Sequence, residues 1–127
     1  RNRRKGIIEN LGEKGERLAA QFLKKRGYRI IEHNFRLRQG EIDIVAMDKK
    51  ELVFVEVKAR SSLNQEFLMA SVNQEKKKRL TRTALYYLRK NNYDGITARF
   101  DVVLIIDTDG YRRVELIKNA FRLDELG

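Results

Sequence analysis

The chain has 127 residues, of which 42% are hydrophobic and 36% charged, so we expect one folded domain over residues 1–127. It has 28 Lys and Arg residues against 18 Asp and Glu residues, a formal net charge of +10. This surplus favours polyanionic partners such as nucleic acid, although a solvated basic surface would have the same composition. The absence of Cys excludes disulfides and thiolate metal sites and favours the reducing cytoplasm.

No segment of the sequence is typical of a membrane protein. The longest uninterrupted apolar run, residues 102–106, is far shorter than a membrane span. Residues 1–10 form a basic N-terminal arm, and no apolar stretch follows residues 1–5 as it would in a signal peptide. We therefore expect no membrane partner.

The first half of the chain predicts one helix and three strands. The helix covers residues 12–25 and ends before Gly27, a residue typical of helix C-termini. Its apolar stripe consists of Leu18, Ala19, Phe22 and Leu23. The strands cover residues 28–35, 41–47 and 52–58. A polar connection over 36–40 and a tight turn over 48–51 join them.

The second half predicts a helix and two further strands. Ser71 and Gln74 have capping-box spacing at the start of a helix that runs to about Lys90. Strands follow over residues 97–106 and 111–117, and a tail from 118 packs through Phe121 and Leu123. The second helix is long enough to return the fourth strand parallel to a neighbour. The order α-β-β-β-α-β-β thus predicts an α/β fold with a mixed sheet flanked by helices.

The turn over residues 48–51 sets the expected register of the second and third strands. With Lys49 and Lys50 as the loop, cross-strand partners have residue numbers that sum to 99. One face is then wholly apolar, with the pairs Ile42–Val57, Ile44–Val55 and Ala46–Val53. The other face is apolar near the turn and ionic at the open end, with the pairs Met47–Leu52, Val45–Phe54, Asp43–Glu56 and Glu41–Lys58.

The expected pair of Asp43 and Glu56 is the candidate metal-binding site. Like charges opposite each other destabilise a sheet, and two adjacent carboxyl groups resist joint ionisation. A divalent cation such as Mg²⁺ or Mn²⁺ resolves both problems, since it prefers oxygen ligands. Lys58 lies on the same face and could orient a water molecule or stabilise charge on a phosphate. A surface ionic network that includes Glu41 is the alternative.

Other charged residues border this position. Glu16 lies at the edge of the buried stripe of the first helix, where it could reach the same site or be an ordinary helix-edge glutamate. The second helix opens with a basic segment, and Lys76 shares a stripe with Leu80, so it points toward the sheet. The candidates for phosphate contacts are Lys76, Lys77, Arg79 and Arg82, and a solvated basic face of the helix is the alternative.

The segments Gly40-Glu41-Ile42-Asp43 and Val55-Glu56-Val57-Lys58 resemble the D…ExK signature of the PD-(D/E)xK nuclease superfamily. The predicted element order also resembles the restriction-endonuclease-like αβββαβ core of that superfamily. More closely, the chain resembles the YraN-like family of small uncharacterised proteins. Further matching segments are Gly15-Glu16, Ala19-Ala20, Leu23, Gly27-Tyr28, Ala59-Arg60, Ser71-Val72, Lys76, Leu80, Phe100-Asp101-Val102 and Asn119-Ala120-Phe121.

The resemblance implies a metal-dependent nuclease. Mg²⁺ or Mn²⁺ would be bound by Asp43, Glu56 and the backbone carbonyl of Val57, and Lys58 would orient or activate the water. Glu16 matches an acidic residue that often completes the site. Lys76 matches a basic position that contacts the phosphate. The proline that often precedes the first acid of the signature is replaced by Ile42.

The sequence leaves three functions open. The first is a nuclease that acts on DNA, with branched or recombining structures among its candidate substrates. The second is a nucleic-acid-binding module without turnover, and the third is a basic protein that binds an acidic partner. Since junction-cutting relatives are often dimers, a homodimer is plausible by analogy.

Overall fold

The computed structural model describes residues 9–61, 73–108 and 110–121. Two helices and five strands follow one another along these residues in the predicted order. They are α1 (Leu11–Lys25), β1 (Arg29–Leu37), β2 (Gly40–Asp48), β3 (Glu51–Arg60), α3 (Gln74–Lys90), β4 (Thr97–Thr108) and β5 (Tyr111–Phe121). The predicted N-terminal arm and the predicted tail beyond residue 121 lie mostly outside the described residues.

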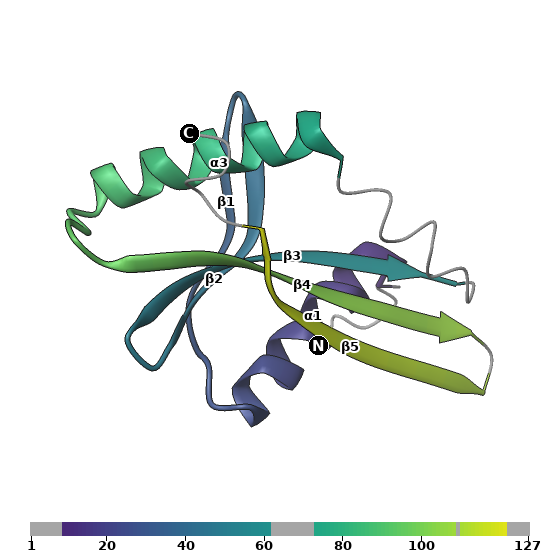
Figure 1. The fold of residues 1–127 in the computed structure, drawn as a ribbon. Helices are drawn as coiled ribbons and strands as arrows, with labels where there is room; N and C mark the ends of the chain where they lie inside the picture. The colour runs from purple at the N-terminus through teal and green to yellow at the C-terminus, as the bar shows by residue number, and fades with distance from the viewer. Residues whose placement is uncertain (1–8, 62–72, 109, 122–127) are drawn as a thin grey trace, which may run out of the picture.

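The five strands form one mixed sheet in the order β1-β2-β3-β4-β5. The β3–β4 pair is parallel and the other three pairs are antiparallel. Helix α3 connects the two parallel strands, as a crossover must. Figure 1 shows the end of the β1–β2 hairpin passing beside α3 at an angle to β3 and β4. The predicted mixed α/β fold is confirmed, and it is consistent with a restriction-endonuclease-like core.

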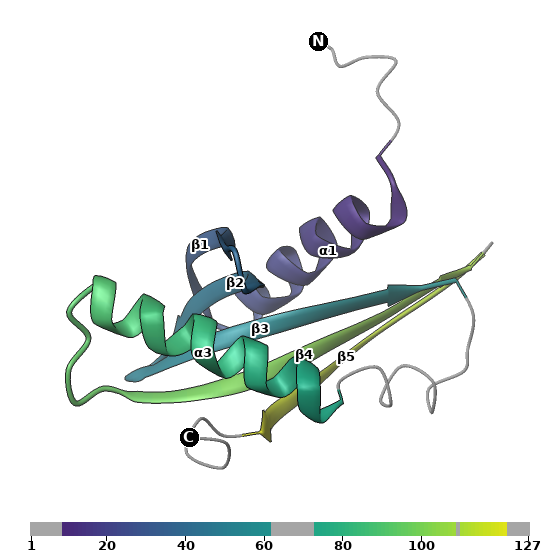
Figure 2. The same cartoon turned by 90° about the horizontal axis from the view of Figure 1, so that it is seen from above.

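The two helices cover opposite faces of the sheet (Figure 2). Helix α1 packs Ala19, Ala20 and Leu23 onto one apolar cluster of the sheet. Helix α3 packs Leu80, Ala84 and Tyr87 onto the other cluster, where aromatic rings of β1, β3, β4 and β5 meet. Both helices bury one amphipathic stripe, so each face of the sheet becomes a separate hydrophobic core.

The ends of the helices differ in how closely they match the sequence. Helix α1 ends as predicted before Gly27, whose φ of 93° is a conformation that glycine adopts at low cost. The predicted cap of the second helix is wrong, because Asn73 and not Ser71 is its N-cap. The Asn73 side chain accepts a hydrogen bond from the backbone N–H of Lys76 at 2.9 Å. This cap fixes the first turn of α3, from which Lys76 projects.

Two glycines allow close approaches that position the candidate site. A Cβ atom on Gly15 would lie 2.6 Å from the Cβ of Ala59, so α1 packs directly against β3 at this point. A Cβ atom on Gly40 would lie 2.7 Å from the hydroxyl of Thr83, so the β1–β2 hairpin packs directly against α3. The start of β2 is thereby held close to α3, and Glu16 is carried on the part of α1 nearest to β3.

Candidate metal centre

Strands β2 and β3 pair as predicted near the turn and separate at Asp43. The register with partners that sum to 99 extends from Asp48–Glu51 to Ile44–Val55. Beyond it, the Asp43 carboxylate accepts a hydrogen bond from the backbone N–H of Val57 at 2.8 Å. The side chain therefore takes the place of a main-chain acceptor, and Asp43 is held against β3 where the strands part.

The separation of the strands changes which residues share a face. Ile42 was expected beside Ile44 and Ala46, but it packs in the cluster under α3, whereas those two pack under α1. The predicted pairing is wrong here because it assumed a regular pleat through Asp43. The alternation on β3 is regular, with Val55 and Val57 toward α1 and Glu56 on the opposite side.

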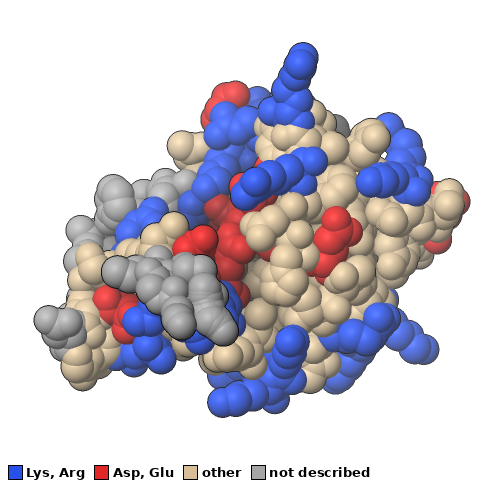
Figure 3. Space-filling model, turned by 180° about the vertical axis from the view of Figure 1, so that it is seen from behind, with Lys and Arg blue, Asp and Glu red and all other residues tan. Residues whose placement is uncertain are grey.

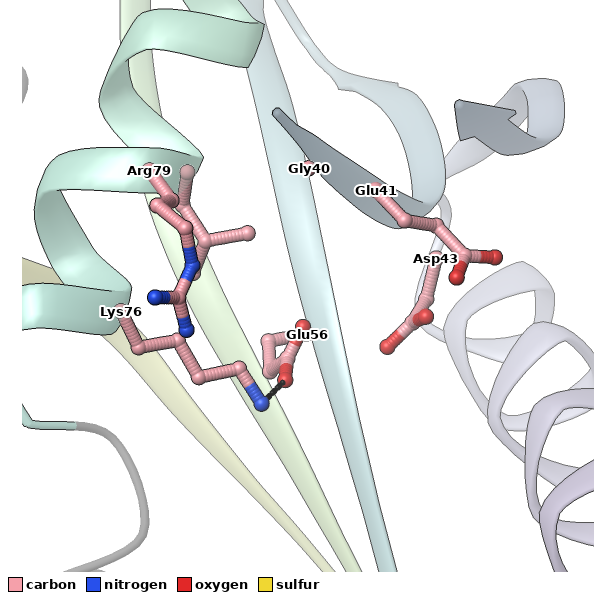
Figure 4. A pocket seen from close by; sticks show the side chains of 7 residues that line it. Gly40, Glu41, Asp43, Glu56, Lys76 and Arg79 are labelled. Atoms are coloured by element: carbon pink, nitrogen blue, oxygen red, sulfur yellow. Dashed lines mark ion pairs between the residues drawn. The ribbon is translucent and has the colours of Figure 1, made fainter. Parts of the chain in front are cut away.

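Glu56 lies at the centre of the site. It is only 6% exposed, and Lys58 is buried to the same extent. One carboxylate oxygen, Oε2, lies 3.1 Å from Lys58 Nζ and 2.6 Å from Lys76 Nζ. Figure 4 shows Lys76 reaching from α3 toward Glu56, so this lysine points toward the sheet as its position on the helix predicted. Two ammonium groups thus share one buried carboxylate oxygen.

Three other acids meet beside Glu56. Glu16 of α1 and Glu41 and Asp43 of β2 have carboxylate oxygens within 4.8 Å of one another, the one such group of three or more among the described residues. Figure 4 shows Glu41 and Asp43 on the same strand, near Glu56. Glu16 therefore lies at the site with Asp43 and is not an ordinary helix-edge glutamate, the alternative that the sequence left open.

Glu41 is a second residue, besides Ile42, that the sequence interpretation placed wrongly. It was expected opposite Lys58, but it faces Arg36 across the β1–β2 hairpin and pairs with that guanidinium at 3.0 Å. The signal was present in the sequence. With residues 38–39 as a two-residue loop, β1 and β2 partners sum to 77, which places Arg36 opposite Glu41. Lys58 is therefore not neutralised by Glu41.

The close charges perturb several protonation equilibria. Burial, followed by the negative charge of Glu56, raises the pKa of Asp43 from 3.8 to about 8, against the lowering effect of the Val57 N–H. Burial and the neighbouring Lys76 lower the pKa of Lys58. Burial opposes the charge of Lys76, but its contacts with Glu56 raise its pKa overall. Like charges are held together here in a partly buried place, which is typical of functional sites.

An open pocket of about 250 Å³ gives access to these groups. It is lined by Gly40, Glu41, Asp43, Glu56, Lys76, Arg79 and Leu80. Lys58 contacts Glu56 from β3 without lining this pocket. Seen from behind, the molecule presents a strip of Asp and Glu side chains flanked by Lys and Arg side chains (Figure 3). This face of the molecule therefore carries acidic side chains with basic side chains beside them.

Comparison with known proteins identifies the family. The model of the uncharacterised protein family UPF0102 matches residues 15–105 of the chain. The chain belongs to this family. A UPF0102 protein of Desulfosudis oleivorans is 46% identical over 113 residues, which cover 89% of this chain and 90% of that protein. A second, of Syntrophus aciditrophicus, is 45% identical over 119 residues, with 92% and 94% covered.

More distant members match over the same extent. The UPF0102 protein of Persephonella marina is 40% identical over 113 residues, which cover 89% of this chain and 94% of that protein. The predicted YraN-like resemblance is thereby confirmed as membership of UPF0102. The region that matches the family model contains every candidate site residue, from Glu16 to Arg82. No helix among the described residues is long and apolar enough to cross a membrane.

The basic residues predicted for phosphate contact divide into two groups in this UPF0102 protein. Lys76 and Arg79 line the pocket. Lys77 and Arg82 do not line it: the Lys77 ammonium lies 5.4 Å from the centre of the Phe121 ring, and Arg82 is exposed on α3. Lys76 and Arg79 therefore belong to the candidate site, and Lys77 and Arg82 lie outside its pocket.

The donors at this site suit a hard divalent cation. Asp43, Glu56, Glu16 and Glu41 offer carboxylate oxygens, which Mg²⁺ and Mn²⁺ prefer, and there are no thiolates or imidazoles among them. Burial first, and the negative charge of Glu56 second, raise the pKa of Asp43, and a bound cation would offset both effects. The residues present therefore fit the metal that the PD-(D/E)xK resemblance implies.

Proposed function

We propose that this UPF0102 protein is a divalent-metal-dependent nuclease that hydrolyses phosphodiester bonds, most readily in DNA. The observation that carries the proposal is the presence of Asp43 and Glu56 in one open pocket, with Lys58 in contact with Glu56. The negative charge of Glu56 adds to burial in raising the pKa of Asp43, and the buried ammonium of Lys58 lies 3.1 Å from Glu56. This combination of acids and a lysine supports the D…ExK resemblance found in the sequence.

The residues have separate roles in this proposal. Asp43 and Glu56 would bind the cation, with the Val57 carbonyl as the main-chain ligand that the resemblance implies. When bound, Mg²⁺ polarises a phosphoryl oxygen and makes water a better nucleophile. Lys58 would donate a hydrogen bond to the attacking water or to the phosphate, since its ammonium is fixed beside Glu56. Glu16 would supply a further carboxylate from α1.

The substrate follows from the charge around the pocket. Arg79 and Lys76 stand at one wall, and the exposed Arg82 continues along the same helix. Together with a formal charge of +10, these groups favour a polyanion over a small phosphate ester. We propose DNA with branched or recombining structure as the first substrate class to test.

A nucleic-acid-binding module without turnover is the second candidate function. One observation favours it. The ammonium groups of Lys58 and Lys76 already balance the charge of Glu56, so this carboxylate needs no metal ion to be neutralised. Such a module would bind nucleic acid in a salt-dependent manner, and that binding would survive the loss of Asp43.

Cleavage assays on labelled single-stranded, duplex and branched DNA, and on RNA, would test the proposal. We expect cleavage with Mg²⁺ or Mn²⁺, none with EDTA, and losses of more than about a hundredfold in Asp43→Ala and Lys58→Ala. Folding of each variant would be checked by circular dichroism. Folded wild-type protein that binds these substrates but cuts none of them with either metal would favour the binding module instead.

A further inference from the structure

Lys58 and Lys76 hold the same oxygen of Glu56 in different ways. The side chain of Lys58 is 7% exposed and belongs to the same strand as Glu56, two residues away. The side chain of Lys76 is 30% exposed and reaches Glu56 from the other side of the pocket, on α3. Lys58 is thus built into the sheet, whereas Lys76 can withdraw into the pocket by rotation of its own side chain.

The contact of Lys76 with Glu56 competes with any cation at that carboxylate. The Lys76 ammonium lies 2.6 Å from Oε2, the distance of a direct charge-assisted hydrogen bond. It also lies in the pocket that opens to Asp43, so its charge acts on both candidate metal ligands. A divalent cation bound to Asp43 and Glu56 would repel this ammonium at close range.

We propose that Lys76 is an exchangeable cation that neutralises Glu56 before metal binds and then transfers its contact to a phosphate of the substrate. The inference rests on the proposed function, because it assumes that Asp43 and Glu56 bind the metal. Lys76 is therefore a positioning residue in the metal-free site and a phosphate-binding residue in the loaded site. Its side chain couples the two binding events.

The first turn of α3 gives Lys76 a fixed base for this exchange. Its backbone N–H is capped by the Asn73 side chain at 2.9 Å, so withdrawal from Glu56 requires no change in the helix. The released ammonium would remain at the wall of the pocket, beside Arg79. A phosphate there would meet two cations close to the metal, which makes metal binding and phosphate binding mutually favourable.

Arg79 offers a matched control. It lines the same pocket, carries the same charge and lies one helical turn from Lys76, but it forms no ion pair with any carboxylate among the described residues. Neutralising Arg79 removes positive charge from the pocket without releasing Glu56. A difference between the two variants therefore reports the contact with Glu56 and not the general potential of the pocket.

Titration of Mn²⁺ into the nucleic-acid-free protein, followed by calorimetry, tests the exchange. We expect Lys76→Gln to bind Mn²⁺ about tenfold more tightly than wild type, and Arg79→Gln to bind it within about twofold of wild type. Lys76→Arg retains the charge and should bind Mn²⁺ as wild type does. Equal tightening in Lys76→Gln and Arg79→Gln, or no tightening in Lys76→Gln, would overturn the proposal.

Binding of labelled DNA with phosphorothioate linkages, with and without Mn²⁺, gives the reciprocal readout. In wild type we expect Mn²⁺ to strengthen DNA binding, and in Lys76→Gln we expect this gain to fall about tenfold. Arg79→Gln should weaken DNA binding by the same factor with and without Mn²⁺. An undiminished gain in Lys76→Gln would contradict the exchange.

Failure of the proposed function has a different signature from failure of the exchange. If wild-type protein binds no Mn²⁺, or if Asp43→Asn binds it as tightly as wild type, the carboxylates are not the metal ligands and both proposals fall. If Asp43→Asn abolishes Mn²⁺ binding while Lys76→Gln and Arg79→Gln behave alike, the metal site stands and only the exchange falls.

Discussion

Two ionic clusters lie on opposite faces of the same sheet, and they differ in how their charges are matched. On the α1 side, Arg99 of β4 donates hydrogen bonds to Asp101, Asp48 and Glu51. The Asp101 carboxylate also accepts the Tyr28 hydroxyl at 2.7 Å and the backbone N–H of Asn119 at 2.9 Å. Asp101 is fully buried, and each of these contacts joins a donor to an acceptor. We call this group the Arg99 cluster.

The cluster around Glu56, on the α3 side, has neighbours of like charge. Asp43 faces the charge of Glu56, and Lys58 faces the charge of Lys76. Burial and the like charge beside it raise the pKa of Asp43 and lower that of Lys58, whereas contacts with Asp101 and Asp48 raise the pKa of Arg99 despite its burial. The Arg99 cluster therefore stabilises the fold, and the Glu56 cluster holds charges that a ligand would stabilise.

The largest expected effect is on the Arg99 cluster. Asp101→Ala should lower the free energy of unfolding by about 3–5 kcal/mol, because it leaves the buried Arg99 without its one fully buried carboxylate partner. Urea denaturation measures this value. Tyr28→Phe, which removes the hydrogen bonds of this hydroxyl with Asp101 and Arg99 and retains the ion pair, should cost about 2 kcal/mol. Equal losses in the two variants would mean that the ion pair is not what stabilises this face.

The second effect concerns the Glu56 cluster and metal. Mn²⁺ at a hundred times its dissociation constant should stabilise the wild-type protein by about 2.7 kcal/mol, since it binds the folded state alone. Asp43→Asn should lose this gain, because it removes a ligand that bears charge. Denaturation curves with Mn²⁺ and with EDTA give the comparison. If Mn²⁺ stabilises Asp43→Asn as much as wild type, the metal binds outside the Glu56 cluster.

The third effect is a pH dependence that belongs to Asp43. Its pKa is higher in the folded protein, at about 8, than its ordinary value of 3.8. The folded state therefore retains the proton more strongly, so this contribution to stability is complete below pH 3.8 and is lost as the pH rises through 8. The slope for one proton reaches at most about 1.4 kcal/mol per pH unit.

Urea denaturation in EDTA at about pH 5.5 and about pH 7.5 measures this dependence. Wild type should lose stability relative to Asp43→Asn as the pH rises, because the variant cannot ionise at this position. Glu56 and Glu16 are the other carboxylates that act on Asp43, and they remain in both proteins. A constant difference between the two proteins over this range would show that Asp43 does not titrate there.

The smallest effect is at the edge of the Arg99 cluster. Glu51 pairs with Arg99, but 41% of its side chain is exposed to solvent. Glu51→Gln should therefore cost less than about 1 kcal/mol, because water and the other carboxylates replace the lost charge. Urea denaturation beside Asp101→Ala checks this order. A loss as large as that of Asp101→Ala would make the exposed partner as important as the buried one.

Much of the fold was predictable because its signals are local. The apolar stripes predicted both helices, and the Asp48–Glu51 turn predicted the register that the structure has from Ile44 to Asp48. Strand ends were less predictable. Residues of the predicted 36–40 connection extend β1 to Leu37 through a two-residue loop at 38–39 that the sequence interpretation did not consider. Residues of the predicted tail extend β5 to Phe121, because β4 supplies hydrogen bonds that no local pattern reveals.

The candidate site was predictable in its members and less so in its geometry. Alternation on β3 placed Glu56 and Lys58 on one side, and the stripe on α3 directed Lys76 toward them. The separation of β2 from β3 at Asp43 could not be predicted, since it depends on a hydrogen bond between a side chain and the opposite strand. The position of Glu16 at the site could not be predicted either, because it depends on how closely α1 packs against β3, a tertiary contact.

One paired measurement tests the contrast between the clusters most directly: the Mg²⁺-dependent cleavage rate and the free energy of unfolding of Asp43→Asn and Asp101→Asn. Both variants neutralise one acid of the sheet. We predict that Asp43→Asn stays at least as stable as wild type at neutral pH and loses cleavage. Asp101→Asn should lose stability, while its folded fraction cleaves at the wild-type rate. Wild-type cleavage by Asp43→Asn would contradict the proposal that the Glu56 cluster is the active centre.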